Sequence, residues 1–461
     1  MLTHSFTPEL VAALKQRRHK LGDRLPTPVL LWSGSASPRN FLANHHPFRA
    51  SSHFLYFAGV PLQDAVIHLH RDQLTLFMED ATPVDALWHG PSPQRSEIAD
   101  RLGAAAHYPL TELHQVAQGA ATIPVQNLAT RQHQVQVLGR PLGEANTLKG
   151  QDLILAEALV ELRLVQDDWA IAAIQQAADI TVKAHLAGMA QTHHAKTEAE
   201  VRATLERVIM AAQMEPAYQS IVTTHGEVLH SQTYHHSLNP GDLLLVDVGA
   251  EHPLGWASDV TRTWPVSGQW SATQRAIYDV VLAAHDACIA AICPGVEYRD
   301  IHLIAATAIT EGLVDLGILR GNVATLVERG AHGLFFPHGI GHLLGLDVHD
   351  MEDLGDLAGY APGRVRSNEY GMQYLRLNRP LEPGMVVTIE PGFYQVLKIL
   401  EDQECRDTFA DCVNWERLTD FADVRGIRIE DDVLVTATGC RVLTSALPTQ
   451  ADAIIQCLES C

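Results

Sequence analysis

The sequence lacks a run of about 18 uninterrupted apolar residues, a block of consecutive lysines or arginines, and the paired cysteine spacings of a structural zinc site. The first absence argues against a membrane-spanning helix. The second, together with a formal net charge of -21, argues against nucleic acid or an anionic membrane as the main partner. The third argues against a thiolate metal site.

The cysteines and the amino-terminal residues bear on the compartment of the protein. Seven scattered cysteines are typical of free thiols in a reducing environment, although Cys405 and Cys412 share one polar insertion and could pair. Residues 1–20 contain basic side chains but no apolar stretch followed by a small-residue cleavage site, so no secretion signal is predicted. We therefore expect a cytoplasmic protein.

What the sequence does contain predicts two domains. Its 461 residues exceed what one hydrophobic core usually supports, and 46% hydrophobic with 19% charged residues is typical of a globular protein. Helical periodicity over Gln151–Leu164, and again over Asp168–Ala190, places the boundary near Leu164. We expect an N-terminal domain over residues 1–164 and a larger C-terminal domain over residues 165–461.

Residues 1–164 alternate between helical and strand patterns. The apolar spacing from Thr7 to Lys20 predicts a helix. The runs Pro28–Trp32, Phe54–Val60, Ala65–Leu69 and Leu74–Met78, separated by Pro, Gly and Asp, predict strands. This part of the chain is therefore expected to be a smaller α/β domain.

Residues 165–461 show helical patterns that alternate with an antiparallel set of strands. Ala272–Ile292 and Ile301–Leu316 predict helices, and the strand patterns Met385–Ile389 and Gly426–Val435 lie near the end of the chain. This order predicts an α+β fold, with an antiparallel sheet covered by helices on one face, in place of a doubly wound parallel sheet.

Two polar, glycine-containing insertions, residues 351–379 and 398–423, lie beside strands that carry carboxylates. Long loops in such positions commonly shape a substrate site. We therefore expect the insertions to border a site, and the sequence leaves their exact role open.

Two acids lie on a predicted hairpin. The apolar run Leu243–Asp247 ends in a carboxylate, and a turn with Pro253 and Gly255 separates it from Asp259, so both acids can reach one face. A buried, ionised carboxylate is costly unless it is paired or binds a cation. Taken alone, either acid could instead cap a turn or pair with Arg262.

The C-terminal half supplies further candidate ligands. His338, His342 and His349 fall within one glycine-punctuated loop, and three histidines so close together are better explained as ligands and substrate contacts than as ordinary core residues. A second apolar strand delivers Glu390 at its end. Further on, Arg428 and Glu430 are two positions apart and so share one face of a strand.

Four acids and one imidazole form a hard, oxygen-rich set of possible ligands. Such a set favours Mn(II), Co(II), Fe(II) or Zn(II) in a carboxylate-bridged pair. One divalent ion would leave excess negative charge, whereas two ions balance four acids and can lower the pKa of a shared water toward neutrality. The set consists of Asp247, Asp259, His342, Glu390 and Glu430.

These segments resemble the pita-bread metallopeptidases, in the branch of Xaa-Pro aminopeptidases (aminopeptidase P) and Xaa-Pro dipeptidases (prolidases). The resemblance covers nearly the whole chain, and Phe48–Gly59 looks like the N-terminal domain signature of that branch. It implies a pita-bread C-terminal domain that hydrolyses the bond before proline. The strongest matches are Leu245–Pro265, His338–Asp350, Leu381–Tyr394 and Gly426–Asp432.

The resemblance also implies a role for each metal ligand. Asp247 corresponds to the acid that holds one metal, and His342 and Glu390 correspond to the ligands of the other. Asp259 and Glu430 correspond to the bridging pair. The family implies two divalent ions, with manganese favoured here and cobalt, zinc or iron as alternatives.

Four further residues take substrate or supporting roles from the resemblance. His230 and His349 look like the pair of histidines beside the substrate, and His338 matches a further pocket histidine. Glu390 could also pass a proton to the proline nitrogen, and Arg428 resembles an arginine that orients the bridging acids. The plainer alternatives are that His230 is only a packed neighbour and that Arg428 makes a surface ion pair.

The expected substrates are peptides with proline at the second position. The main alternative is a strict dipeptidase, which differs in whether the pocket beyond proline is closed by a carboxylate clamp. A non-catalytic peptide-binding protein of the same fold is more remote, because all five ligands are present, and a metal-independent, creatinase-like amidinohydrolase has no use for four converging acids. The family further implies a homo-oligomer, either a dimer or a tetramer.

Overall fold

The structure is a computed structural model that describes residues 6–459. The chain divides into two compact units: Met1–Trp169 with Met351–Ala358, and Ala170–Asp350 with Gly359–Cys461. Six cysteines are free thiols, Cys405 and Cys412 among them, whereas Cys461 lies outside the described residues, as does the start of the predicted N-terminal domain. Among residues 6–459, no helix is both long and apolar enough to cross a membrane.

The first unit is built on a five-stranded mixed sheet with the strand order β6-β5-β4-β1-β7. β1, β4 and β5 pair antiparallel, and the outer strands β6 and β7 join in parallel. Leu30, Trp32, Val66 and Phe77 form part of its buried core. The strands are β1 (Val29–Trp32), β4 (Val66–His70), β5 (Gln73–Phe77), β6 (Ala106–Tyr108) and β7 (Ala121–Thr122), beside a separate hairpin of β2 (Pro38–Phe41) and β3 (Asn44–His45).

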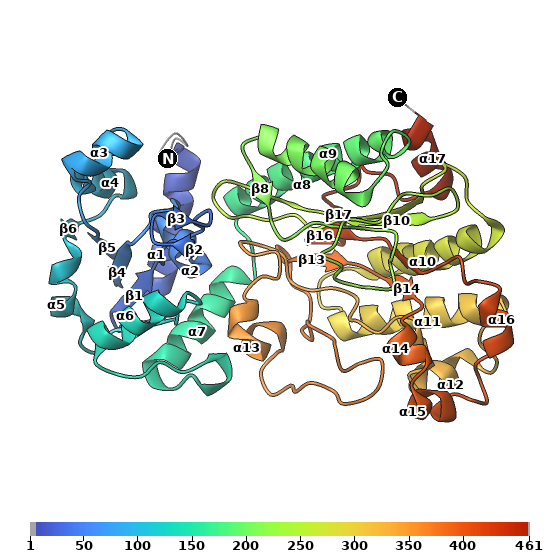
Figure 1. The fold of residues 1–461 in the computed structure, drawn as a ribbon. Helices are drawn as coiled ribbons and strands as arrows, with labels where there is room; N and C mark the ends of the chain where they lie inside the picture. Colours follow the sequence, from blue (N-terminus) through green and yellow to red (C-terminus); the bar gives the residue numbers. More distant parts are fainter. Residues whose placement is uncertain (1–5, 460–461) are drawn as a thin grey trace. The chain divides into compact units, whose positions relative to one another are not determined.

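The helices of this unit lie around that sheet (Figure 1). The predicted strand Phe54–Val60 is wrong, because this segment forms a buried helix that ends where Gly59 adopts a positive φ of 66°; a short apolar run does not by itself distinguish a strand from a helix. The α-helices are α1 (Pro8–Arg24), α2 (Ser52–Ala58), α3 (Pro83–His89), α4 (Arg95–Leu102), α5 (His114–Ala117), α6 (Leu128–Leu138) and α7 (Gly150–Arg163), with short 3-10 turns η1 (Leu110–Glu112) and η2 (Ala145–Thr147).

A short segment from the second half of the sequence, Met351–Ala358, belongs to the first unit. It contains the 3-10 turn η4 (Glu352–Leu354). The Oδ2 atom of Asp353 lies 3.1 Å from Nε2 of the buried His53, whose Nδ1 lies 3.0 Å from Nη1 of Arg163. A polar contact with a buried histidine of the first unit therefore holds a segment that directly follows the predicted histidine loop.

The second unit carries several small antiparallel sheets. β12, β10 and β9 form one, β13, β16 and β17 form another, and the pairs β14-β15 and β11-β8 complete the set. The strands are β8 (Glu215–Pro216), β9 (Ile221–Thr223), β10 (Leu243–Asp247), β11 (Ala250–Glu251), β12 (Thr261–Pro265), β13 (Val386–Ile389), β14 (Gly392–Tyr394), β15 (Gly426–Arg428), β16 (Asp431–Val435) and β17 (Cys440–Val442).

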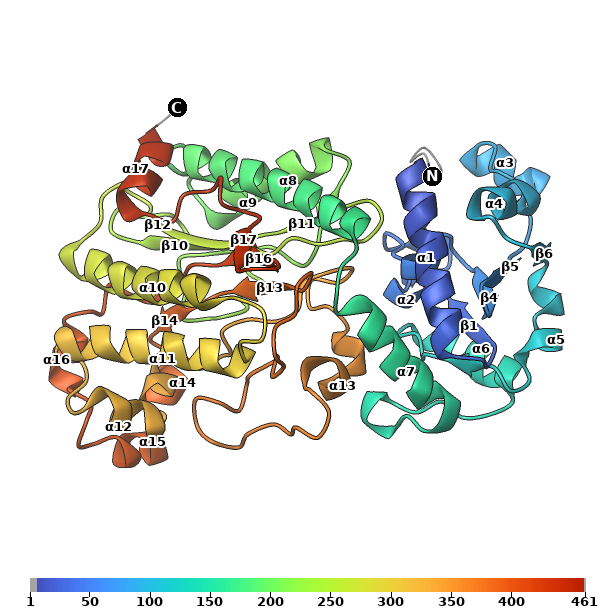
Figure 2. The same cartoon turned by 180° about the vertical axis from the view of Figure 1, so that it is seen from behind.

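Helices cover these strands, as the view in Figure 2 shows for α8, α10 and α11. α10 packs on β13, β14 and β15, and α9 packs on β8 and β9. The unit is therefore α+β, as predicted. Its α-helices are α8 (Asp168–Thr192), α9 (Glu198–Ala211), α10 (Ala272–Ala291), α11 (Tyr298–Asp315), α12 (Val323–Glu328), α14 (Leu397–Leu400), α15 (Gln403–Thr408), α16 (Trp415–Thr419) and α17 (Ala451–Glu459), with the 3-10 turn η3 (Ala331–Leu334). The short helix α13 (Asp356–Gly359) lies mostly in the first unit.

Two strand patterns of the sequence are interrupted beside acids that line the cavity described below. The strand expected over Gly426–Val435 splits around Glu430, so that β15 pairs with β14 while β16 pairs with β13. The run after Asp247 does not continue its strand either, because β11 pairs with β8. Each acid thus lies at a strand end, where the backbone changes partners.

Gly249 lies directly after the first of these strand ends. A Cβ atom at Gly249 would collide with the carbonyl oxygen of Ser258, and the surrounding backbone cannot yield as a side chain would. We expect Gly249→Ala to lower the free energy of unfolding by about 1–3 kcal/mol. Urea unfolding measures this, and Gly439→Ala, where nothing lies near the new atom, should stay within about 0.5 kcal/mol. Equal losses in both variants would contradict this account.

Candidate functional site

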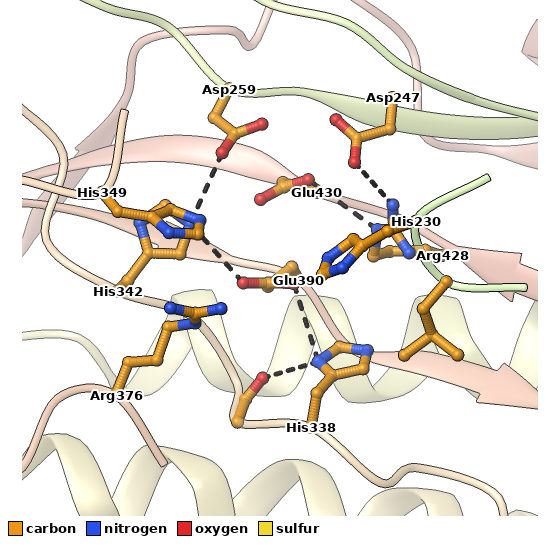
Figure 3. Close-up of a pocket in the computed structure, with 12 residues that line it drawn as sticks. His230, Asp247, Asp259, His338, His342, His349, Arg376, Glu390, Arg428 and Glu430 are labelled. Carbon is orange, nitrogen blue, oxygen red and sulfur yellow. Dashed lines mark hydrogen bonds and ion pairs between the residues drawn. The ribbon is translucent and has the colours of Figure 1, made fainter. Parts of the chain in front are cut away.

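One cavity of about 100 Å³ in the second unit brings together all nine side chains that the sequence predicts for the site. Figure 3 shows side chains from both halves of this unit pointing into it. The cavity is lined by Leu229, His230, Asp247, Asp259, His338, Gly339, His342, His349, Arg376, Glu390, Arg428 and Glu430.

Strand pairing places the acids. Asp247 ends β10, and its pairing partner in β12 is Thr261, so Asp259 lies just beyond the paired region on the same hairpin. The backbone N–H of Glu430 donates to Thr261 O at 3.0 Å, and that of Glu390 donates to Ile340 O at 2.8 Å. Four acids distant in sequence therefore converge because their backbones are hydrogen-bonded to neighbouring strands and loops.

The acids and His342 form overlapping groups of possible ligand atoms. Asp247, Asp259 and Glu430 place one oxygen each within 4.8 Å of one another, and His342, Glu390 and Glu430 do the same with one atom each. Glu430 belongs to both groups. A third such group contains Asp259, His342 and His349. The overlap offers two adjacent positions where a divalent cation could bind.

A backbone contact orients the ring of His342. Its Nδ1 lies 3.0 Å from the carbonyl oxygen of Leu343 and donates to it, so Nε2 is the nitrogen that faces the acids. Nε2 lies 3.4 Å from Oδ2 of Asp259 and 3.7 Å from Oε1 of Glu390. An imidazole that presents Nε2 beside two carboxylates is suited to bind a metal.

Burial raises the pKa of each of the four acids. The pKa of Glu390 rises to about 8, and that of Glu430 lies well above its ordinary value because the neighbouring acids Asp259 and Glu390 add to the cost of burial. Asp247 and Asp259 are raised as well, chiefly by burial. Without a cation, the folded protein therefore resists ionising the whole set.

Arg428 is the positive charge at the back of the cavity. Its Nη2 donates to Oδ2 of Asp247 at 2.6 Å, and its Nε donates to Oγ1 of Thr261 at 2.9 Å. The Thr261 hydroxyl in turn donates to Glu430 at 2.6 Å. Arg428 is 4% exposed, which contradicts the alternative of a surface ion pair, and it orients one acid directly and a second through a hydroxyl.

Two tyrosines support the site and were not singled out from the sequence. Tyr218 donates its hydroxyl to Oδ1 of Asp247 at 2.5 Å. The Tyr394 hydroxyl lies 2.8 Å from Nε2 of His338 and accepts from Nη1 of Arg428 at 2.9 Å. Tyr394 ends the segment Leu381–Tyr394, which carries part of the family resemblance, so it could have been predicted from the sequence. No sequence pattern marks Tyr218.

His338 is a neutral histidine. Burial lowers its pKa to about 3, and the positive charge of Arg428 adds to the effect. Its Nδ1 donates to Gly339 O at 2.8 Å, so the 3.6 Å approach to Oε2 of Glu390 is not an ion pair near neutral pH. Nε2 is then left to accept from Tyr394.

His230, His349 and Arg376 line other parts of the cavity wall. His230 is exposed, and its pKa is lowered by partial burial and by Arg428. The ring of His349 lies 4.1 Å from that of His342. Arg376 comes from the insertion 351–379 and was missed, because no motif distinguished it from the other charges there. The other insertion contributes no residue to the cavity in the described part of the chain.

A further layer of charges fixes the backbone behind the acids. Arg262 pairs with Asp431 at 2.8 Å, so the alternative in which Arg262 neutralises Asp247 or Asp259 is wrong. Asp432 accepts from the hydroxyl of Ser258 at 2.6 Å and from the backbone N–H of Asp259 at 3.0 Å. Arg262 is thus engaged away from the cavity acids, and the arginines that line the cavity with them are Arg428 and Arg376.

Known proteins similar to this chain share both of its parts. Residues 172–437 match the model of metallopeptidase family M24, and residues 14–125 match the aminopeptidase P N-terminal domain. A Podospora anserina protein named "Probable Xaa-Pro aminopeptidase PEPP" is 33% identical over 92% of both chains. A Metarhizium robertsii protein named "Probable Xaa-Pro aminopeptidase" is 32% identical over 87% of this chain and 83% of its own.

Solved structures resemble the whole chain. Aminopeptidase PepP from Pseudomonas aeruginosa has a TM-score of 0.79 at 27% identity and covers 98% of both chains. Proline aminopeptidase P II from Yersinia pestis has a TM-score of 0.78 at 26% identity, over 98% of this chain and 100% of its own. With an aminopeptidase P N-terminal domain followed by a pita-bread catalytic domain, the chain belongs to metallopeptidase family M24.

Proposed function

We propose that this protein is a Xaa-Pro aminopeptidase, which removes the N-terminal residue of peptides whose second residue is proline. The observation that carries the proposal is the convergence of His342 and four acids, three of them buried, in two overlapping groups of ligand atoms. Relatives of nearly full length bear the name Xaa-Pro aminopeptidase. A solved relative of similar structure, aminopeptidase P from E. coli, was crystallised with the inhibitor Pro-Leu.

Two divalent ions fit this set of residues. Asp247, Asp259 and Glu430 would hold one ion, and His342, Glu390 and Glu430 would hold the other, with Asp259 beside both. Hard oxygen ligands and one imidazole suit Mn(II), which we propose, or Co(II), Zn(II) and Fe(II). When bound, the ions supply Lewis-acid polarisation of the scissile carbonyl and activation of a water.

The remaining side chains would orient the peptide and move protons. His230 and His349 line the cavity, where an imidazole N–H can donate to the oxygen of the scissile carbonyl as negative charge develops on it. Glu390, besides holding an ion, would pass a proton to the proline nitrogen. His338 shapes the pocket wall, and Arg428 orients Asp247 and Glu430.

The finer features remain proposals of their own. Free thiols among the described cysteines support a cytoplasmic location. The family resemblance supports a homo-oligomer, either a dimer or a tetramer, which light scattering in solution would test.

Removal of divalent ions should abolish the activity. We expect an EDTA-treated enzyme to lose at least about 100-fold in kcat/KM for Ala-Pro-Ala and to recover it with added Mn(II), because the acids alone cannot polarise the carbonyl. Asp259→Asn should retain less metal than the wild type by elemental analysis and should not recover. Full activity in a metal-free sample would contradict the proposal.

The stability of the metal-free protein should fall as the pH rises from about 6.5 to 8. The folded-state pKa of Glu390 is raised to about 8, whereas an unfolded glutamate ionises near pH ~4, so the folded state holds a proton that the unfolded chain has lost. Below pH ~6.5 His302 and His332 oppose this trend, because burial lowers their pKa to about 3 and about 4, while the unfolded histidines gain a proton there.

Urea unfolding at several pH values measures this dependence. Glu390→Gln should flatten the fall between about pH 6.5 and 8, since an amide does not titrate, and added Mn(II) should stabilise the wild type more at pH 8 than at pH 6.5. A metal-free protein whose stability rises steadily through this window would disprove the explanation.

Substrate length should separate the aminopeptidase from a strict dipeptidase. We expect Ala-Pro-Ala to be cleaved with a higher kcat/KM than Ala-Pro, while Ala-Ala-Ala serves as the control without proline. Liquid chromatography of the products gives the rates. Cleavage of Ala-Pro alone would favour a dipeptidase.

A further inference from the structure

His230 reaches the cavity from a segment that we call the His230 loop, residues 224–236. The loop follows β9, and Leu229 packs against the buried residues Ile221, Leu245 and Tyr394. His230 itself is exposed, and no side chain among residues 6–459 forms a hydrogen bond or ion pair with its ring. Its position therefore depends on what holds the two ends of the loop.

Glu198 contacts both ends. Its Oε1 accepts from the backbone N–H of Thr224 at 2.7 Å and from the Thr224 hydroxyl at 3.1 Å. Its Oε2 lies 2.9 Å from Nδ1 of His236, which donates to it. One carboxylate thus joins the first residue of the loop to the last.

The carboxylate is buried and placed where its charge is favoured. Glu198 is 0% exposed and is the first residue of α9, whose N-terminus carries a partial positive charge. Its own backbone N–H donates to His236 O at 3.2 Å, and the next N–H, of Ala199, donates to Tyr234 O at 3.1 Å. The start of α9 is therefore a rigid base for the far end of the loop.

The near end of the loop rests on the strand that carries Arg428. A Cβ atom on Gly226 would lie 2.7 Å from the carbonyl oxygen of Gly426, the first residue of β15, so only glycine permits this approach. The His225 and His236 rings lie 4.2 Å apart. Glu227 pairs with Arg425 at 2.8 Å. The loop is thus packed against the site strand on one side and tied to α9 on the other.

We propose that Glu198 is a positioning residue for His230, which it holds in the cavity by joining Thr224 to His236 at the base of the loop. The proposal rests on the role proposed above for His230. Without the carboxylate, Thr224 and His236 lose their shared hydrogen-bond partner, and holding the two ends of the loop together costs more conformational entropy. His230 would then spend less time in the geometry that donates to the substrate oxygen.

A double-mutant cycle on the metal-loaded enzyme tests this role. We expect Glu198→Ala to lower kcat/KM for Ala-Pro-Ala about tenfold in the wild-type background but less than about twofold in a His230→Ala background. The matched control is Glu200→Ala, which removes an exposed acid from the same first turn of α9 and should change kcat/KM less than about twofold. Metal content should equal that of the wild type in all variants.

Hydrogen exchange of peptides that cover residues 225–236 is the second readout. Glu198→Ala should speed exchange in this loop and leave β10 and β13 protected as in the wild type. If Glu198→Ala does not fold, His236→Gln takes its place in the double-mutant cycle, because this change removes the contact between His236 and Glu198 from the side of the loop.

Two results would overturn the inference. One is an equal loss in both backgrounds, which assigns Glu198 a general structural role, and the other is unchanged exchange in the loop. If His230→Ala alone keeps full activity, the proposed role of His230 is wrong, and the exchange data still decide whether Glu198 holds the loop.

Discussion

The mutual repulsion of four carboxylates that share one cavity is the constraint around which the second unit is organised. Asp247, Asp259, Glu390 and Glu430 lie in one cavity, and burial raises the pKa of each. Arg428 compensates only part of this charge. Bringing these acids together in one cavity raises the free energy of the folded state, and cations that bind the ionised acids lower it again. Metal binding and folding of this region are therefore linked.

The surroundings of the acids follow from the same constraint. Each acid lies at the end of a strand or at a break between strands, where its backbone groups still pair with a neighbouring strand or loop. Hydroxyl groups of Tyr218 and Thr261 donate to carboxylate oxygens without adding charge. Such donors orient the acids and leave their remaining lone pairs toward the cavity.

Much of the site could be predicted because its residues end strongly apolar strands or lie in a glycine-punctuated loop. Asp247 and Glu390 stand out in this way, and His342 follows from its loop. Strand ends and loop motifs could not predict Arg376, Tyr218 and Glu198, because the importance of these residues depends on tertiary contacts between distant segments. The α+β class followed from the order of elements, whereas Phe54–Val60 was mistaken for a strand, since its apolar run is too short to show a helical period.

The segment Met351–Ala358 has a consequence for how the chain can be divided. It leaves the second unit just after His349 and returns before Arg376, while its own packing partners, including His53, lie in the first 169 residues. A fragment that begins at residue 170 would therefore carry an unsupported stretch between two residues of its own cavity wall. The amino-terminal part of the chain thus supplies the packing partners of a stretch that lies, in the sequence, between two residues of the cavity wall.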